Sequence, residues 1–148
     1  MTDYDWMKAA YQLAVEAEKG GEVPVGAVVV SETNQLIGQG FNSVIRQHDP
    51  TAHAEILAIK EAARTLQNYR LLNATLYVTL EPCPMCIGAL VHARVKRLVF
   101  ACRDFKSGAA GSVFNLAQGY PLNHKILVDE GIMQHECAAL LSDFFKNR

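Results

Sequence analysis

The sequence has no long apolar run, little net charge and only four cysteines among its 148 residues. No apolar stretch approaches the ~20 residues that a membrane-spanning helix needs, so we expect no membrane partner. The acidic start at residues 1–5 has neither the basic nor the apolar region of a signal peptide. Only Cys83 and Cys86 lie close together, as a metal-binding pair does, while Cys102 and Cys137 stand alone. These absences favour a cytoplasmic protein.

The chain also lacks the internal repeats, low-complexity tracts and linkers that would divide it into parts. Its length is that of one domain, and half of its residues are hydrophobic, which is enough for a complete core. We therefore expect residues 1–148 to form a single domain.

Charge is unevenly distributed along the chain. Residues 1–55 carry three basic and eight acidic side chains, a net charge of −5, whereas residues 56–148 carry eleven basic and seven acidic ones, a net charge of +4. Residues 94–106, which we call the basic stripe, contain one acidic side chain, Asp104, and five basic ones: Arg94, Lys96, Arg97, Arg103 and Lys106. The stripe could steer a polyanion, or it could be an ordinary solvated rim.

Apolar periodicity and turn residues predict an alternation of helices and strands. Asp3 would cap a first helix that ends at Gly20, and Asp49-Pro50 would open a second helix that contains His53 and Glu55. The core face of this second helix would consist of Ile56, Ile59, Ala63 and Leu66. The predicted strands span residues 23–30, 35–42, 75–80, 97–101 and 125–128, the other helices span 84–91, 112–117 and 133–145, and a polar loop spans 43–49. Such alternation indicates a sheet covered on both faces, with ligands bound where strand ends meet helix starts.

Two short segments carry the residues of a catalytic metal site. His53-Ala54-Glu55 and Pro82-Cys83-Pro84-Met85-Cys86 offer one imidazole and two thiols, which are ligands that zinc prefers. Three protein ligands leave zinc an open position for water, which is the arrangement of a catalytic site rather than a structural one. Glu55 is not needed as a ligand and is a suitable base for the activated water. The pattern H-x-E followed by P-C-x-x-C is typical of zinc-dependent nucleobase deaminases.

The spacing leaves two points open. His53 and Glu55 would diverge by about 200° on an ideal helix of roughly 3.6 residues per turn, so the glutamate must reach back across the helix end. The alternative to a catalytic site is a closed structural one, in which Cys102 or another histidine supplies a fourth ligand and Glu55 has no role. Spacing alone permits both arrangements.

Beyond these motifs, the sequence resembles bacterial tRNA-specific adenosine deaminases over nearly its whole length. The matching segments are residues 22–27 (EVPVGA), 48–55 (HDPTAHAE), 68–71 (NYRL), 79–83 (TLEPC), 106–111 (KSGAAG) and 136–145 (ECAALLSDFF). The chain departs from the family at Ser43-Val44, where relatives often have Arg-Pro. This departure concerns a loop that we expect to border the substrate pocket.

The resemblance implies a fold, a reaction and an assembly. The fold is α/β: the three-layer α/β/α cytidine-deaminase-like fold, in which a mixed five-stranded sheet is flanked by about five helices. The reaction is the hydrolytic, zinc-dependent deamination of adenosine to inosine at the wobble position of a tRNA anticodon. It requires one zinc ion per chain and no organic cofactor. The enzymes of this family work as homodimers, in which both subunits contact the anticodon stem-loop.

The resemblance also implies roles for individual residues. His53, Cys83 and Cys86 bind zinc, and Glu55 moves protons between water and substrate. Substrate contacts are expected from Asn42, Ala54, Arg103, Asp104, Lys106 and Asn123. Simpler roles stay open, since Asn42 could be a turn residue at a strand end and Asn123 a helix or turn cap.

The RNA backbone is expected to meet basic residues of the stripe and of the C-terminus, namely Arg94, Arg97, Arg103, Lys106, Lys146 and Arg148. Asp104 is an unusual member of this set, because a carboxylate repels phosphate. It would either accept a hydrogen bond from a ribose 2′-hydroxyl, or pair with Arg103 or Lys106, or cap its own loop.

Two other functions fit part of these features. A free-base or nucleotide deaminase of the same superfamily, acting on guanine or cytosine, would need the zinc site but neither the basic stripe nor Asn123. A zinc-stabilised RNA-binding module would need the three metal ligands but not Glu55.

Overall fold

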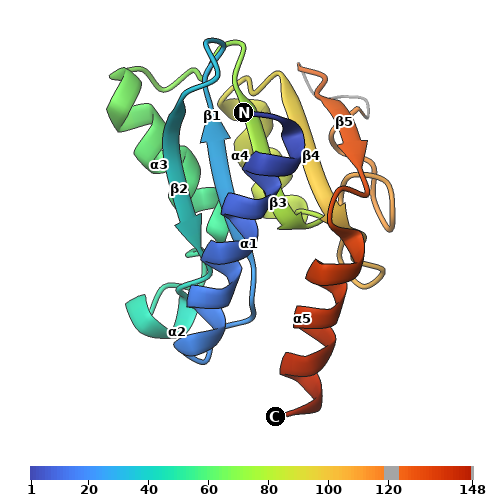
Figure 1. The fold of residues 1–148 in the computed structure, drawn as a ribbon. Helices are drawn as coiled ribbons and strands as arrows, with labels where there is room; N and C mark the ends of the chain where they lie inside the picture. The colour runs from blue at the N-terminus through green and yellow to red at the C-terminus, as the bar shows by residue number, and fades with distance from the viewer. Residues whose placement is uncertain (119–123, 148) are drawn as a thin grey trace.

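The computed structural model describes residues 1–118 and 124–147, which form one five-stranded sheet with helices on both sides (Figure 1). The strands are hydrogen-bonded in the order β2-β1-β3-β4-β5. β1 is antiparallel to β2 and β3, whereas β3, β4 and β5 are parallel, so the sheet is mixed. The elements are α1 (Asp3–Lys19), β1 (Gly26–Val30), β2 (Leu36–Phe41), α2 (Val44–Gln47), α3 (Ala54–Leu66), β3 (Thr75–Leu80), α4 (Pro84–His92), β4 (Arg97–Cys102), β5 (Leu127–Glu130) and α5 (Gln134–Lys146).

Successive residues of the central strands face opposite sides of the sheet, as the pleat requires. On one side, Val28 and Tyr77 pack with Trp6 of α1 and Cys137 of α5. On the other side, the alternate strand residues pack with α3 and α4. Figure 1 shows α1 in front of the sheet and α4 behind it. This three-layer α/β/α arrangement confirms the predicted fold class, and none of the described helices is long and apolar enough to cross a bilayer.

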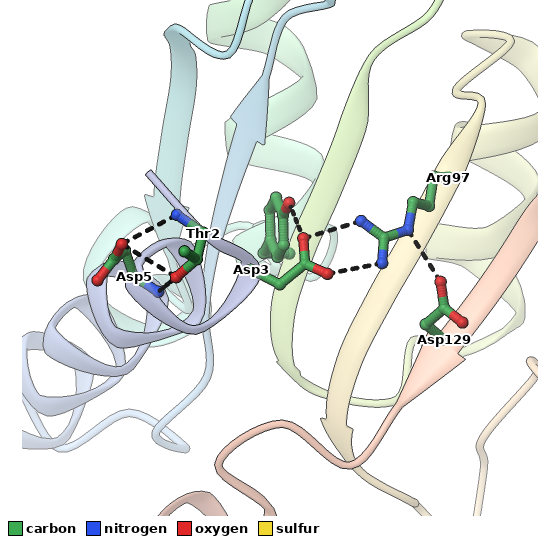
Figure 2. A network of polar contacts seen from close by, with 6 residues as sticks. Thr2, Asp3, Asp5, Arg97 and Asp129 are labelled. Atoms are coloured by element: carbon green, nitrogen blue, oxygen red, sulfur yellow. Dashed lines mark hydrogen bonds and ion pairs between the residues drawn. The ribbon is translucent and has the colours of Figure 1, made fainter.

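The first helix does not begin with the predicted cap. Thr2, and not Asp3, caps α1: the Thr2 hydroxyl accepts the N–H of Asp5 at 3.2 Å, and the Asp5 carboxylate accepts the N–H of Thr2 at 2.9 Å (Figure 2). This reciprocal pair satisfies the free donors at the helix start. Asp3 is therefore available for a contact elsewhere.

Asp3 joins the first helix to one end of the sheet (Figure 2). Its carboxylate accepts two hydrogen bonds from the Arg97 guanidinium, at 2.9 and 2.8 Å, and one from the Tyr77 hydroxyl at 2.6 Å. The same guanidinium donates to Asp129 at 2.9 Å. We call these four residues the Arg97 clamp. Because Tyr77, Arg97 and Asp129 belong to β3, β4 and β5, the clamp ties α1 to three strands.

The helix that carries Glu55 begins at Ala54, and the prediction that it opens at Asp49-Pro50 is wrong. The Asp49 carboxylate accepts both the backbone N–H and the hydroxyl of Thr51, at 2.8 and 2.7 Å. Such a side-chain contact closes a turn instead of opening a helix. His53 consequently stands outside the helix as its N-cap, with an extended backbone (φ −75°, ψ 153°).

The predicted core face of α3 is only partly correct. Ile59 and Ala63 are partly buried and pack against the core, but Leu66 is 41% exposed. The fully buried positions are Ala54, Ala58 and Ala62. The reason lies in β2, where a side chain at Gly38 would collide with the α3 backbone at Ala58 and Ala62. Small residues on both elements allow a close approach. This packing holds the middle of α3 against the sheet.

Four further segments differ from the predictions. The loop predicted at residues 43–49 contains the short helix α2, whose first N–H groups, those of Ile45 and Arg46, are accepted by the buried Glu22 carboxylate at 3.1 and 2.8 Å. Residues 112–117, all of them described, form no helix; Ala110 and Asn115 make an isolated antiparallel bridge. β1 and β5 begin at Gly26 and Leu127, later than predicted.

Candidate active site

The starts of α3 and α4 bring three possible metal ligands together. His53 is the N-cap of α3, Cys83 is the N-cap of α4, and Cys86 lies in the first turn of α4. His53 Nδ1 lies 3.7 Å from Cys83 Sγ and 3.5 Å from Cys86 Sγ. In a tetrahedral zinc site, a nitrogen at ~2.0–2.1 Å and a sulfur at ~2.3 Å from the metal are about 3.6 Å apart. The donor atoms and their spacing therefore fit one zinc ion.

Cys102, the alternative fourth ligand, is directed elsewhere. Its thiol donates to the carbonyl of Thr79 at 3.3 Å. The cluster of possible ligands that the described residues form contains His53, Cys83 and Cys86, without Cys102. The geometry therefore matches a site with three protein ligands and an open position.

The protonation of the cysteine pair also suits a metal. The pKa of Cys83 is lowered to about 4, mainly by a hydrogen bond from Cys86 and to a smaller extent by one from His53. The same hydrogen bond, together with burial, raises the pKa of Cys86, and the contact with Cys83 raises the pKa of His53. Cys83 is therefore a thiolate, and Cys86 and His53 hold protons next to it. A zinc ion can displace these protons, because it binds deprotonated ligands.

Glu55 lies beside these ligands and is almost fully buried. Burial is the largest cause that raises the pKa of Glu55 to about 7, and the charge of His53 opposes the rise. The divergence expected on a helix does not arise, because His53 precedes the helix and both side chains line the same pocket. A carboxyl group with a pKa near neutrality can accept and return protons at physiological pH.

His53, Cys83 and Glu55 line a cavity of about 210 Å³. The loop after β4 and the segment after β2 both contribute to its wall. The lining residues are Val23, Val25, Asn42, His53, Glu55, Leu80, Glu81, Cys83, Asp104 and Ser107. Segments that follow three different strands therefore surround the metal ligands, at the end of the sheet where β3 and β4 terminate.

Asn42 and Ala54 meet at the edge of this cavity. The Asn42 side-chain oxygen accepts the N–H of Ala54 at 2.9 Å, which leaves the amide nitrogen of Asn42 for the cavity. The N–H of Ala54 is occupied by this bond and the methyl group is fully buried. Ala54 therefore orients Asn42, and the predicted contact of Asn42 with the substrate stays a prediction.

Glu81 is a site residue that the sequence reasoning missed. Its buried carboxylate accepts the N–H groups of Asp104, Ala110 and Ser112, at 3.0, 2.9 and 3.1 Å, and also the hydroxyl of Ser112. Gly108 packs so closely that a side chain there would collide with this carboxylate. Glu81 thus anchors residues 104–112, which we call the anchored loop. The only signal in the sequence is an acidic residue directly before the P-C-x-x-C motif.

The Asp104 carboxylate shapes the same loop. It accepts the N–H groups of Lys106 and Ser107 at 2.9 and 3.2 Å, and the Ser107 hydroxyl at 3.1 Å. These bonds agree with the simpler of its predicted roles, that of a loop cap. The contact with a ribose hydroxyl stays a prediction.

The basic stripe does not form one free surface beside the cavity. Arg103 pairs with Glu130 through two contacts of 2.9 and 2.7 Å. Arg97 belongs to the clamp at the opposite end of β4, and Arg94 donates to the carbonyl of Val91 at 2.9 Å. Lys106 is exposed and forms no ion pair with any residue that the structure describes. Asn123 and Arg148, also predicted as RNA contacts, lie outside the described residues.

Comparisons with known proteins identify the family to which the chain belongs. Residues 1–102 match the family described as the cytidine and deoxycytidylate deaminase zinc-binding region. The tRNA-specific adenosine deaminase of Haemophilus influenzae is 53% identical over 146 residues, which are 99% of this chain and 84% of that protein.

Solved structures give the same picture. One from a study of A-to-I editing by tRNA:A34 deaminases at the wobble position matches with a TM-score of 0.89 and 38% identity, over 93% of this chain and 99% of its own. A guanine deaminase from Nitrosomonas europaea matches with a TM-score of 0.78 and 27% identity, over 95% and 83% of the two chains. Because the similarity spans the whole chain and includes the metal-binding segments, the chain belongs to the tRNA-specific adenosine deaminases, a family of zinc-dependent hydrolases.

Proposed function

We propose that this protein converts adenosine to inosine at the wobble position of a tRNA anticodon. The supporting observation is that the possible metal ligands His53, Cys83 and Cys86 cluster beside the cavity that Glu55 lines, in a chain 53% identical to a tRNA-specific adenosine deaminase. Zinc held by the three ligands would supply an activated water. The cavity is smaller than the ~300–1,000 Å³ of pockets for drug-sized ligands, so it suits one base taken out of its stack.

Glu55 performs the proton transfers of this reaction. It takes one proton from the attacking water and passes it to a ring nitrogen of adenine while the oxygen adds to C6. A second proton from the added hydroxyl then goes to the departing amino group. Adenosine and water become inosine and ammonia, and Glu55 regains its starting state. The amide nitrogen of Asn42, oriented by Ala54, is placed to contact the base.

The substrate region and the assembly belong to the same proposal. The protein would bind the anticodon stem-loop as a homodimer, in the cytoplasm. The apolar residues Ile87, Leu90 and Val91 of α4 are buried in the protein's own core. A subunit contact through α4 would use its other side, where Gly88 borders open space. Sedimentation at micromolar concentration should show a dimer, and a 16.3 kDa species alone would contradict it.

An assay of ammonia and inosine release tests the reaction. The zinc-loaded protein would receive an anticodon stem-loop with adenosine at the wobble position, a matched stem-loop with that adenosine shifted by one position, free guanine and cytidine. We expect turnover of the first substrate alone. Preferential turnover of guanine would assign the protein to the chemistry of its guanine deaminase neighbour, and tight RNA binding without turnover would make it a binding module.

A further inference from the structure

Phe105 is the most exposed large hydrophobic side chain in the described part of the chain, with 78% of its surface accessible. It lies in the anchored loop, directly after Asp104 and two residues before Ser107, both of which line the cavity. A ring so exposed adds little to the stability of the fold, because the hydrophobic contribution scales with the apolar area removed from water. Its position at the rim of the cavity therefore calls for another explanation.

The ring is carried by a constrained backbone. On one side of Phe105, the N–H of Asp104 is held by Glu81 at 3.0 Å. On the other side, the N–H groups of Lys106 and Ser107 are held by the Asp104 carboxylate at 2.9 and 3.2 Å. Ordering this loop on binding therefore costs little conformational entropy, which makes the ring a preorganised contact.

The surroundings suit an unpaired nucleobase. Flipping the reacting adenosine into the cavity removes it from the stack and leaves the neighbouring base without that partner. Single-stranded RNA is commonly bound by stacking its bases on exposed aromatic rings next to cationic side chains. Lys106, the next residue in the chain and also exposed, can supply such a cation.

We propose that Phe105 stacks on the nucleobase next to the reacting adenosine and so forms a second base-binding position beside the catalytic cavity. This inference rests on the proposed function, because it requires a single-stranded polynucleotide substrate. It explains why an apolar ring stands in water at the cavity rim and why the loop beneath it is anchored by a buried carboxylate.

Substitutions at Phe105 test the contact, with Tyr69→Ala as a matched control. Tyr69 is similarly exposed, at 73%, but lies between α3 and β3, outside the cavity lining. Phe105→Ala should lower kcat/KM for the stem-loop by roughly 5- to 150-fold, the range expected for one lost stacking contact. Phe105→Tyr should retain activity, Phe105→Leu should lose most of it, and Tyr69→Ala should match the unchanged protein. Zinc content and Tm should not change.

Stem-loops with an abasic nucleotide on one or the other side of the reacting adenosine identify the stacked base. One abasic substrate should lower kcat/KM of the unchanged protein as much as Phe105→Ala does, and with that substrate the variant should lose nothing further. Equal losses on every substrate, or full activity of Phe105→Ala, would overturn the stacking contact. Dissociation of the Phe105→Ala variant in sedimentation would also overturn it, since the ring would then pack against a second copy. No turnover by the unchanged protein would instead refute the proposed function.

Discussion

Carboxyl groups at the two ends of strands β3 and β4 are in opposite environments. At their amino ends, the Arg97 clamp pairs each carboxylate with the guanidinium, and the hydrogen bond from Arg97 is the largest cause that lowers the pKa of Asp3 (Figure 2). At their carboxyl ends, Glu55 is buried without a lysine or arginine partner among the described residues, and burial raises its pKa to about 7.

This difference in environment gives the carboxyl groups at one end a role in stability and Glu55 at the other end a role in the reaction. A carboxylate that is paired stays ionised and stabilises the fold, whereas a buried carboxyl with a raised pKa can exchange protons at neutral pH. The parallel pair β3 and β4 holds both ends in one rigid frame. We therefore expect a change at Glu55 to remove activity with little loss of stability, and changes at the clamp end to do the reverse.

Removing a metal ligand should produce the largest effect. Cys83→Ala leaves two protein ligands, so zinc should fall well below one per chain and inosine formation should become undetectable. Elemental analysis of the purified protein and the stem-loop assay measure both. Cys102→Ala is the matched control and should keep zinc and activity. Loss of zinc in the control would favour the closed structural site.

Glu81→Gln should produce the next largest effect. An amide replaces one of the two acceptor oxygens with a donor, which then faces N–H groups of the anchored loop. Since hydrogen bonds to a charged group contribute about 1.5–3 kcal/mol each, we expect kcat/KM for the stem-loop to fall by roughly 10- to 100-fold, mainly through KM, with zinc retained.

Glu22→Gln is the control for this variant, because Glu22 is equally buried and anchors α2 instead of the loop. It should destabilise the protein by a similar amount while changing KM less. An unchanged KM in Glu81→Gln would show that the anchored loop does not contribute to substrate binding.

At the clamp end, Arg97→Met should destabilise the protein without changing its chemistry. The substitution leaves the carboxylates of Asp3 and Asp129 without their partner and should lower the free energy of unfolding by about 1–2 kcal/mol. Urea unfolding measures this loss. The kcat of the folded, zinc-loaded variant should equal that of the unchanged protein, so a reduced kcat would contradict the separation of the two ends.

The smallest expected effect is the pH dependence of the clamp. The folded pKa of Asp3 lies below its unfolded value of about 3.9, so its contribution is present above that pH and is lost as the pH falls through the folded pKa. Asp3→Asn should therefore lower the free energy of unfolding by up to about 1 kcal/mol at pH 6, since the pair is partly exposed, and by progressively less below pH 4. Unfolding of both zinc-free proteins between pH 3 and 6 tests this, and a pH-independent difference would contradict it.

The sequence was sufficient to predict which side chains come together as possible metal ligands, because these residues belong to short motifs that lie at helix starts. A metal ligand is identified by its residue type and local spacing, and the order of strands and helices brings the two motifs together. The motifs did not predict the backbone conformation at His53. The turn closed by Asp49 places His53 before the helix, and this is what lets it share a cavity with Glu55.

The features that the sequence did not reveal depend on partners far along the chain. Arg97 and Arg103 look like free cations in a basic segment, yet their partners are Asp3 and Glu130, which lie in other elements. The role of Glu81 depends on donors more than 20 residues away, which no local pattern indicates. Buried or paired charges of this kind follow from tertiary packing and not from residue type.

Replacing Glu55 with glutamine tests the central claim most directly, namely that the buried carboxyl at the cavity end moves the protons of the reaction. Glutamine preserves the size of the side chain but cannot exchange a proton at neutral pH. We predict one zinc per chain, an unchanged Tm and a kcat for the stem-loop that is about 10²- to 10⁴-fold lower, the usual contribution of a general acid–base group. A zinc-loaded Glu55→Gln protein that forms inosine at the rate of the unchanged protein would contradict the account.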